Sequence, residues 1–229
     1  MIKRTIVIAI ISAVIIIMAT AGSLSSTKSV EHSTLGSDNR GTVTKDVYNP
    51  QSETKFKIAI ITGMHPREKV SMNVTSDAIK NYAQSNKVEI VHYKIAVNAN
   101  LDYVRLGRLN GEGLVTDYVT PDISKSGYDL VIICHDHKKG YGDGYYVATP
   151  TMDAKSLALA EKFRAISPEY KYYQRDPEKK AKSKSISRVD APIAASGTPL
   201  FIYEIPEWSG YQEAYDITYK LIDTGYKLA

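Results

Sequence analysis

The chain has 229 residues, with 29 basic and 25 acidic side chains and a formal net charge of +4 at pH 7. Hydrophobic residues make up 43% of it, which is enough for a packed core and excludes a wholly disordered chain. The small excess of positive charge argues against a nucleic-acid partner. The single cysteine, Cys134, excludes an internal disulfide and any metal site built from several cysteines.

The first residues predict a targeting segment. Lys3 and Arg4 precede an uncharged, apolar run over residues 5–21. A basic start followed by such a run is typical of either a cleaved signal peptide or an uncleaved membrane anchor. We therefore expect residues 1–22 to place the rest of the chain on the extracellular face, secreted or membrane-anchored. Residues 23–55 are rich in Ser and Thr without apolar periodicity, so they are predicted to form a linker.

From Phe56 onward, strand patterns alternate with helix patterns. The run at 129–134 (DLVIIC) is continuously apolar and is predicted to be the central strand. The basic stretch 175–188 has no apolar pattern and is predicted to be an exposed loop. We predict strands over 56–63, 88–97, 129–134, 145–148, 170–174 and 200–205, and helices over 69–85, 153–166 and 209–226. This alternation predicts one α/β domain over 56–229, with a mixed, mostly parallel sheet flanked by helices, behind the hydrophobic N-terminal helix.

Polar side chains stand at the ends of three predicted strands. His65 and Glu68 follow the first, His135 follows the central one, and Glu204 lies near the end of the last. Ligand sites of such sheets lie at the carboxyl ends of the strands, so we expect these side chains to converge. Two imidazoles and one carboxylate suit Zn²⁺ and leave a position for water, and Glu204 is placed to accept a proton from that water. The pattern predicts the apparatus for hydrolysing an amide bond.

Two of these assignments have a competing residue. His137 points the same way as His135 on an extended chain, so it is either the third metal ligand or a neighbour that contacts substrate. Glu207 competes with Glu204, but a carboxylate inside a strand pattern is costly unless it has a function or a partner. Between the two histidines, Asp136 either orients an imidazole or caps a turn.

These motifs resemble a known family. Gly63-x-His65-x-x-Glu68 after a strand resembles the first zinc motif of the zinc metallocarboxypeptidases, and most of all their succinylglutamate desuccinylase/aspartoacylase branch. The apolar strand that runs into His135 resembles the family's second zinc motif. The segment 200–206 (LFIYEIP) resembles the strand that carries the catalytic glutamate. The resemblance spans roughly residues 56–226 and keeps the family's order of motifs.

The resemblance implies a set of roles. It implies zinc bound by the two histidines and the glutamate of these motifs, Glu204 as the general base, and Arg108 as the arginine that polarises the scissile carbonyl. The family commonly holds the substrate's terminal carboxylate with an Asn-Arg pair, whereas this chain reads NGEGLV at 110–115 and has no arginine there. The substrate-contacting residues that we predict instead are Arg105, Asn110, His137 and Arg188.

Two functions follow as hypotheses. The first is a secreted or membrane-anchored zinc-dependent hydrolase of an amide or peptide bond. Its substrate would be a peptide or an acylated amino acid, with a cell-wall peptide favoured by the expected location. The second is a non-catalytic module on the same fold that binds metal or a cell-wall polymer. They differ at Glu204, since a hydrolase needs this carboxylate and a binding module does not.

Overall fold

The computed structural model describes residues 29–50, 52–176, 178 and 183–229. The predicted signal peptide or anchor, residues 1–22, lies outside these ranges, so it stays a prediction. In the part of the chain that is described, no helix is long and apolar enough to cross a membrane.

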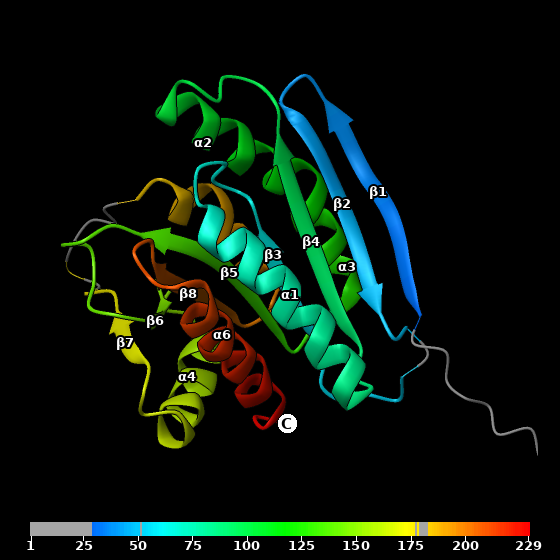
Figure 1. Ribbon diagram of the computed structural model, residues 1–229, viewed down its shortest axis with the longest axis vertical. Helices are drawn as coiled ribbons and strands as arrows, with labels where there is room; N and C mark the ends of the chain where they lie inside the picture. Colours follow the sequence, from blue (N-terminus) through cyan, green and yellow to red (C-terminus); the bar gives the residue numbers. More distant parts are fainter. Residues whose placement is uncertain (1–28, 51, 177, 179–182) are drawn as a thin grey trace, which may run out of the picture.

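The described residues contain one eight-stranded sheet, in the order β1-β2-β4-β3-β5-β8-β6-β7 (Figure 1). The four central strands, β4, β3, β5 and β8, are parallel to one another. At the two borders of this group, β2 pairs antiparallel with β4, and β6 pairs antiparallel with β8. The mixed sheet with a central apolar strand is therefore confirmed. The strands are β1 (Val30–Asp38), β2 (Gly41–Tyr48), β3 (Ile58–Thr62), β4 (Ile90–Val97), β5 (Leu130–His137), β6 (Tyr146–Thr149), β7 (Lys171–Gln174) and β8 (Leu200–Pro206).

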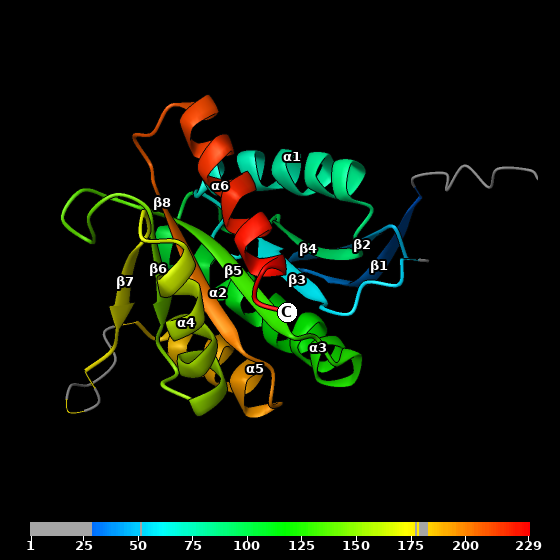
Figure 2. The same ribbon diagram turned by 90° about the horizontal axis from the view of Figure 1, so that it is seen from below.

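Helices cover both faces of the sheet, with α1 and α6 on one side and α2 and α3 on the other (Figure 2). The first face is covered by α1 (Lys69–Asn86), α4 (Ala154–Ile166) and α6 (Tyr211–Tyr226). The second face is covered by α2 (Val104–Leu114), α3 (Thr120–Ser126) and α5 (Ala191–Ala195), together with two π-helical turns, η1 (Val115–Val119) and η2 (Ile186–Asp190).

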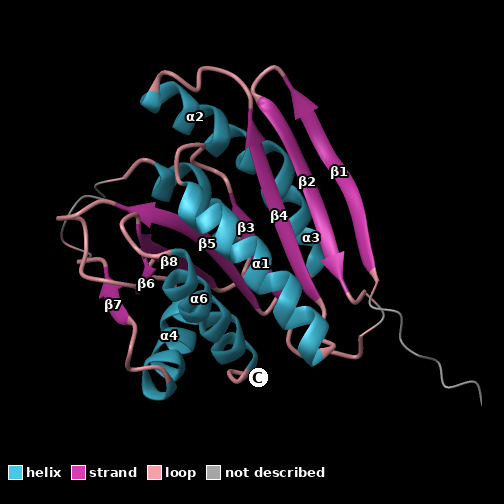
Figure 3. Ribbon diagram, in the orientation of Figure 1, coloured by secondary structure: helices cyan, strands magenta, loops and turns pink. Residues whose placement is uncertain are grey.

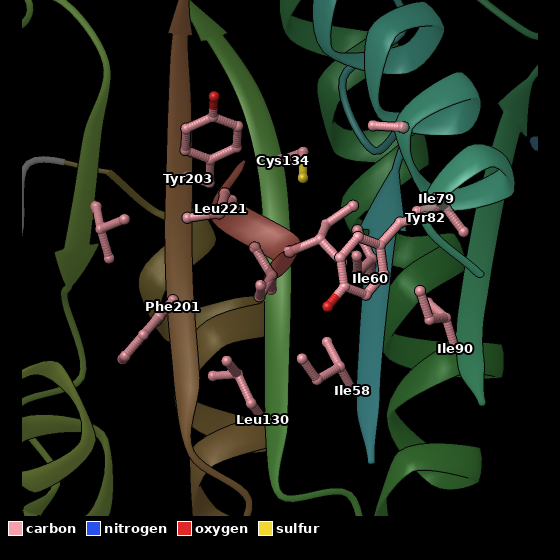
Figure 4. Packing of buried hydrophobic residues seen from close by; sticks show 14 of the residues in the cluster. Ile58, Ile60, Ile79, Tyr82, Ile90, Leu130, Cys134, Phe201, Tyr203 and Leu221 are labelled. Atoms are coloured by element: carbon pink, nitrogen blue, oxygen red, sulfur yellow. The ribbon is translucent and has the colours of Figure 1, made fainter. Parts of the chain in front are cut away.

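Strands β3 and β5 are buried on both faces because residues 58–61 and 130–134 are continuously apolar. In β3, Ile58 and Ile60 face α1 and α6, and the residues between and after them face α2 and α3. Figure 4 shows Ile58 and Ile60 beside Leu130 of β5, with Tyr82 of α1 and Leu221 of α6 packed above them. Each such side chain stabilises the fold by about 1.5–3 kcal/mol through removal from water.

The segment predicted as a linker supplies a β-hairpin, so that prediction is wrong for residues 30–48. β1 pairs antiparallel with β2, and β2 continues the sheet by pairing with β4 (Figure 3). Because an edge hairpin needs only one apolar face, its sequence stays rich in Ser and Thr, and Val43 alone of its residues is completely buried. Arg40, at the hairpin turn, forms ion pairs with Asp38 and with Asp117 of η1.

Two further stretches differ from the sequence prediction. Residues 104–126, for which no element was predicted, form α2, η1 and α3. The predicted loop 175–188 is helical from Ile186 onward, because Val189 packs into the core beneath α2 and α3. α6 begins after Gly210 rather than at Ser209.

Candidate metal centre

Three elements bring His65, Glu68 and His135 together at the carboxyl ends of β3 and β5. His65 lies in the loop after β3, Glu68 immediately precedes α1, and His135 lies within β5. Nδ1 of His65 is 2.8 Å from one oxygen of Glu68, and Nδ1 of His135 is 2.6 Å from the other. One ligand atom from each of the three residues lies within 4.8 Å of the other two. The convergence expected from the strand ends is therefore present in the fold.

Two glycines hold the loop that carries His65. Gly63 has a positive φ of 81°, and a Cβ there would lie 2.3 Å from the carbonyl oxygen of Ile95. On the other side, a Cβ on Gly111 of α2 would lie 1.8 Å from the carbonyl oxygen of Met64. Since no larger residue fits either position without a backbone shift, the loop is fixed between β4 and α2.

Asp136 joins the two halves of the site from the opposite face of β5. Its carboxylate accepts hydrogen bonds from the backbone N–H groups of Val70 (2.9 Å) and Ser71 (2.7 Å), in the first turn of α1. Of its two predicted roles, Asp136 thus fills the capping one. The cap ties the start of α1, and with it Glu68, to the strand that carries His135.

The three ligand-type side chains form a charged, mostly buried group. Burial alone would raise the pKa of Glu68, but the charges of His135 and His65 and their hydrogen bonds outweigh it and hold this pKa below its usual range. Burial lowers the pKa of His135, and the Glu68 carboxylate overcomes this and raises it to about 9. The two imidazole rings stack with centroids 4.4 Å apart. Two imidazole nitrogens directed at one carboxylate are a donor set that fits Zn²⁺.

Glu204 stands beside this group on the neighbouring strand. It is directly opposite His135 in the register of β5 and β8, so both side chains lie on the same face of the sheet. Its Oε2 atom is buried and has no hydrogen-bond partner among the described residues. Burial raises the pKa of Glu204 to about 7. The competing Glu207 is exposed, beyond the end of β8.

Of the three other predicted site residues on α2, only Arg108 contacts the ligand group. Arg108, on α2, is close: its Nη1 atom lies 3.1 Å from Oε1 of Glu68, and its side chain is 41% exposed. Asn110 donates to the carbonyl oxygen of Ala99 at 3.0 Å and thereby holds the loop between β4 and α2. Arg105 is exposed on α2.

His137 lies two residues beyond His135 on β5 and contacts other groups. Its two ring nitrogens face the carbonyl oxygens of Lys138 (3.2 Å) and Gly144 (2.9 Å). These contacts leave neither nitrogen directed at Glu68. Of the two histidines that competed for the third ligand position, His135 is the one that joins the group.

Two acidic residues near the site were missed by sequence reasoning. Glu112 of α2 lies 3.8 Å from Nε2 of His65, and Arg188 of η2 donates to Glu112 at 2.8 Å. Asp190 is 3% exposed, its Oδ1 atom has no hydrogen-bond partner in the described chain, and burial raises its pKa to about 6. Glu112 follows Arg108 by one helical turn, so a helix prediction for this stretch would have placed the two side by side. Nothing in the sequence around Asp190 indicates its position.

Similarity to solved structures supports the fold. The chain superposes on a metallo-carboxypeptidase from Burkholderia cenocepacia with a TM-score of 0.56 and 13% identity, over 87% of this chain and 66% of that one. A succinylglutamate desuccinylase from Chromobacterium violaceum gives 0.52 and 11%, over 86% and 70%. A metallo-carboxypeptidase from Pseudomonas aeruginosa, in complex with (2-guanidinoethylmercapto)succinic acid, gives 0.52 and 14%, over 86% and 62%. The predicted fold is thereby confirmed.

The extent of these similarities is limited. The chain spans about two thirds of the length of the carboxypeptidases on which it superposes. Neither a family model nor a curated protein matches the sequence.

Proposed function

We propose that this chain is a zinc-dependent hydrolase of an amide or peptide bond. One observation carries the proposal: two imidazole nitrogens and a carboxylate converge, and beside them lies a second carboxylate, one oxygen of which has no hydrogen-bond partner among the described residues. Named neighbours on the same fold are metallo-carboxypeptidases and a succinylglutamate desuccinylase, which supports a hydrolase of this class.

The ligand group and Glu204 would have different roles in the hydrolysis. His65, Glu68 and His135 would hold the zinc ion, which when bound lowers the pKa of a water molecule and polarises a carbonyl. Glu204 would take the proton from the attacking water and later deliver it to the leaving amine. Burial raises the pKa of Glu204 in the metal-free protein to about 7, and the charge of a bound zinc ion would lower it again, so that the carboxylate is ionised and can accept a proton near neutral pH.

Arg108 would stabilise the negative charge that develops on the carbonyl oxygen. Its guanidinium rests on Glu68 at 3.1 Å, and its partial exposure leaves it able to reach a substrate. Arg105 and Arg188 remain the proposed contacts for a substrate carboxylate. Arg188 is paired with Glu112 and lies on the same face of the sheet as the ligand group, whereas Arg105 is exposed on α2.

The alternative, a module that only binds metal or a polymer, is less well supported. Burying a carboxylate oxygen without a hydrogen-bond partner costs stability, and a binding module gains nothing from it. A hydrolase gains a base of raised pKa. The position of Glu204 therefore favours catalysis.

The proposed substrate is a peptide or an acylated amino acid outside the cell. The extracellular location depends on residues 1–22, a signal peptide or membrane anchor by sequence pattern alone. A cell-wall peptide fits that location. The neighbour bound to a succinic acid derivative supports a small carboxylate-bearing ligand.

The test compares two glutamates three residues apart. The zinc-loaded protein is assayed against a panel of peptides and N-acylated amino acids, beside Glu204→Gln and the exposed control Glu207→Gln. We expect Glu204→Gln to lower kcat by about 10²–10⁴-fold with zinc content unchanged, and the control to retain full activity. Absence of hydrolysis across the panel, or an active Glu204→Gln variant, would contradict the proposal.

A further inference from the structure

Four aromatic side chains form a continuous strip at the margin of the candidate site. The strip consists of Trp208, His137, Tyr146 and Tyr173. The rings of Trp208 and His137 meet edge to face at 5.3 Å, those of His137 and Tyr146 lie 5.1 Å apart, and those of Tyr146 and Tyr173 meet edge to face at 4.7 Å. It crosses β5, β6 and β7, which lie with β8 on the side of the molecule away from the hairpin (Figure 1).

Strand register places this aromatic strip on the same face of the sheet as the ligand group. His135 is opposite Glu204 across β5 and β8, and Glu204 is opposite Tyr146 across β8 and β6. Side chains at directly opposed positions share a face, so these three residues form one row. Tyr173 of β7 lies outside this row, since it is opposite Ala148, but it shares the face and its ring contacts that of Tyr146. A substrate bound at Glu204 would therefore extend directly onto the strip.

The two ends of the strip are exposed and have a polar border, whereas His137, in its middle, is buried. Trp208 is 47% exposed and Tyr173 is 40% exposed. The ammonium group of Lys139 lies over the Trp208 ring, 5.6 Å from its centre. The backbone N–H of Asp143 donates to the Tyr173 hydroxyl at 3.3 Å. Exposed ring area at each end of the strip thus lies next to a hydrogen-bonding or charged group.

We propose that the aromatic strip binds a saccharide ring of the substrate, next to the amide that the site cleaves. The proposal rests on the function proposed above. A pyranose has a face of C–H groups that packs on the electron-rich face of an aromatic ring. Its hydroxyl groups stay at the edges, where an open and polar border lets them keep hydrogen bonds.

This surface suits a sugar better than an aromatic amino-acid side chain. A phenyl ring gains its binding free energy by nearly complete removal from water, and ligand sites of that kind enclose most of the ligand. The two terminal rings of the strip, Trp208 and Tyr173, remain about half exposed. The substrate class that follows is a saccharide linked to a peptide or acyl group through an amide.

The sequence provides a reporter for the test, because Trp208 is the only tryptophan of the chain. Its fluorescence is followed during titration of the zinc-loaded full chain with the N-acetylglucosamine trisaccharide. N-acetyl-phenylalaninamide is titrated in parallel as the aromatic probe. We expect a saturable change with the trisaccharide, and none with the aromatic probe at equal concentrations.

Two tyrosines on β7 give matched variants. Tyr173 belongs to the strip, whereas its neighbour Tyr172 points to the other face, where Arg164 lies over its ring. We expect Tyr173→Ala to weaken trisaccharide binding by roughly fivefold, and Tyr172→Ala to leave the dissociation constant unchanged. Thermal melting of both variants verifies that they fold.

The possible results separate this inference from the proposed function. No saturable change with the trisaccharide, saturation by the aromatic probe alone, or equal weakening by both variants would overturn the saccharide assignment, even if amides are hydrolysed. Saturable, Tyr173-dependent binding of the trisaccharide without hydrolysis of any amide would support the saccharide site and contradict the proposed hydrolase function.

Discussion

Two acidic side chains on the same sheet show opposite behaviour. Asp46 of β2, in the hairpin edge, is buried and contacts Lys94 at 2.6 Å and His32 at 2.5 Å. Burial alone would raise its pKa, but these two partners outweigh it and lower the pKa. Glu204 of β8, at the carboxyl end, has one oxygen without a partner, and burial raises its pKa to about 7.

The presence or absence of a protein partner distinguishes polar groups that stabilise the fold from polar groups that are available to a ligand. At the hairpin edge, Arg40 pairs with an acidic residue of η1, and Lys45 pairs with an acidic residue of α3. At the carboxyl end, buried atoms of His65, Glu204 and Asp190 lack a partner within the described ranges. Such atoms cost stability, so the three that lie together beside the ligand group indicate a site that a ligand completes, whereas others, such as Nδ1 of His92 on β4, lie apart from it.

The largest expected effect compares two histidine–carboxylate pairs. His65→Ala should remove bound zinc, because it deletes one of three ligands, whereas His32→Ala deletes the hairpin histidine that contacts Asp46 and should keep zinc. Metal content by mass spectrometry, on protein purified without a histidine tag, measures both. The assignment of the metal centre would be contradicted if His65→Ala retained zinc, or if the unaltered protein held no zinc after loading.

The next effect concerns two glycines of α2. Gly111→Ala should destabilise the protein by about 3 kcal/mol, because the added methyl group would overlap the backbone of Met64. Gly113→Ala should cost clearly less, since the methyl group meets the guanidinium of the Arg40 side chain, which can shift while the backbone stays in place. Urea unfolding of both variants checks this, and equal stability would mean that α2 does not confine the loop after β3.

A pH-dependent stability comparison should give opposite signs for the two carboxylates. The pKa of Glu204 is raised, so the metal-free protein loses stability as pH rises from about 4.5 towards 7. Glu204→Gln should therefore stabilise the metal-free protein by about 1–2 kcal/mol at pH 8 and have little effect at pH 4.

Asp46 has a lowered pKa, so its contribution is present above about pH 4 and is lost as pH falls through the folded value. Asp46→Asn should then destabilise by about 1 kcal/mol at pH 7 and much less at pH 3. Denaturant unfolding of both variants at several pH values measures these effects. Effects of the same sign for Asp46→Asn and Glu204→Gln would remove the contrast between the two regions.

The smallest expected effect compares two helix caps. Asp136 caps α1 at the site, and Asp153 caps α4 far from it by accepting from the N–H of Ser156. Asp136→Ala and Asp153→Ala should each cost about 1 kcal/mol of stability. Only Asp136→Ala should also weaken zinc binding, as measured by competition with a chelator, because its cap positions Glu68. Equal zinc affinity in both variants would limit Asp136 to a structural role.

Much of the fold was predictable because apolar periodicity is a local property. The continuous run DLVIIC predicted a central buried strand, and β5 lies between β3 and β8. The hairpin was not predictable in the same way, since only one of its faces is apolar and its charged residues find partners on η1 and α3. Likewise, η2 is helical because Val189 meets the core, which its basic sequence does not reveal.

The sequence by itself determined which chemistry is available: the spacing of His65 and Glu68, the histidine at the end of an apolar strand and a glutamate inside another strand. Strand ends converge by a general rule of parallel sheets, so the group could be predicted before its geometry was known. Only the tertiary structure decided between His135 and His137, and it added Glu112, Asp190 and the aromatic strip. Those choices depend on register and on helices packed across the sheet, which bring together residues far apart in the chain.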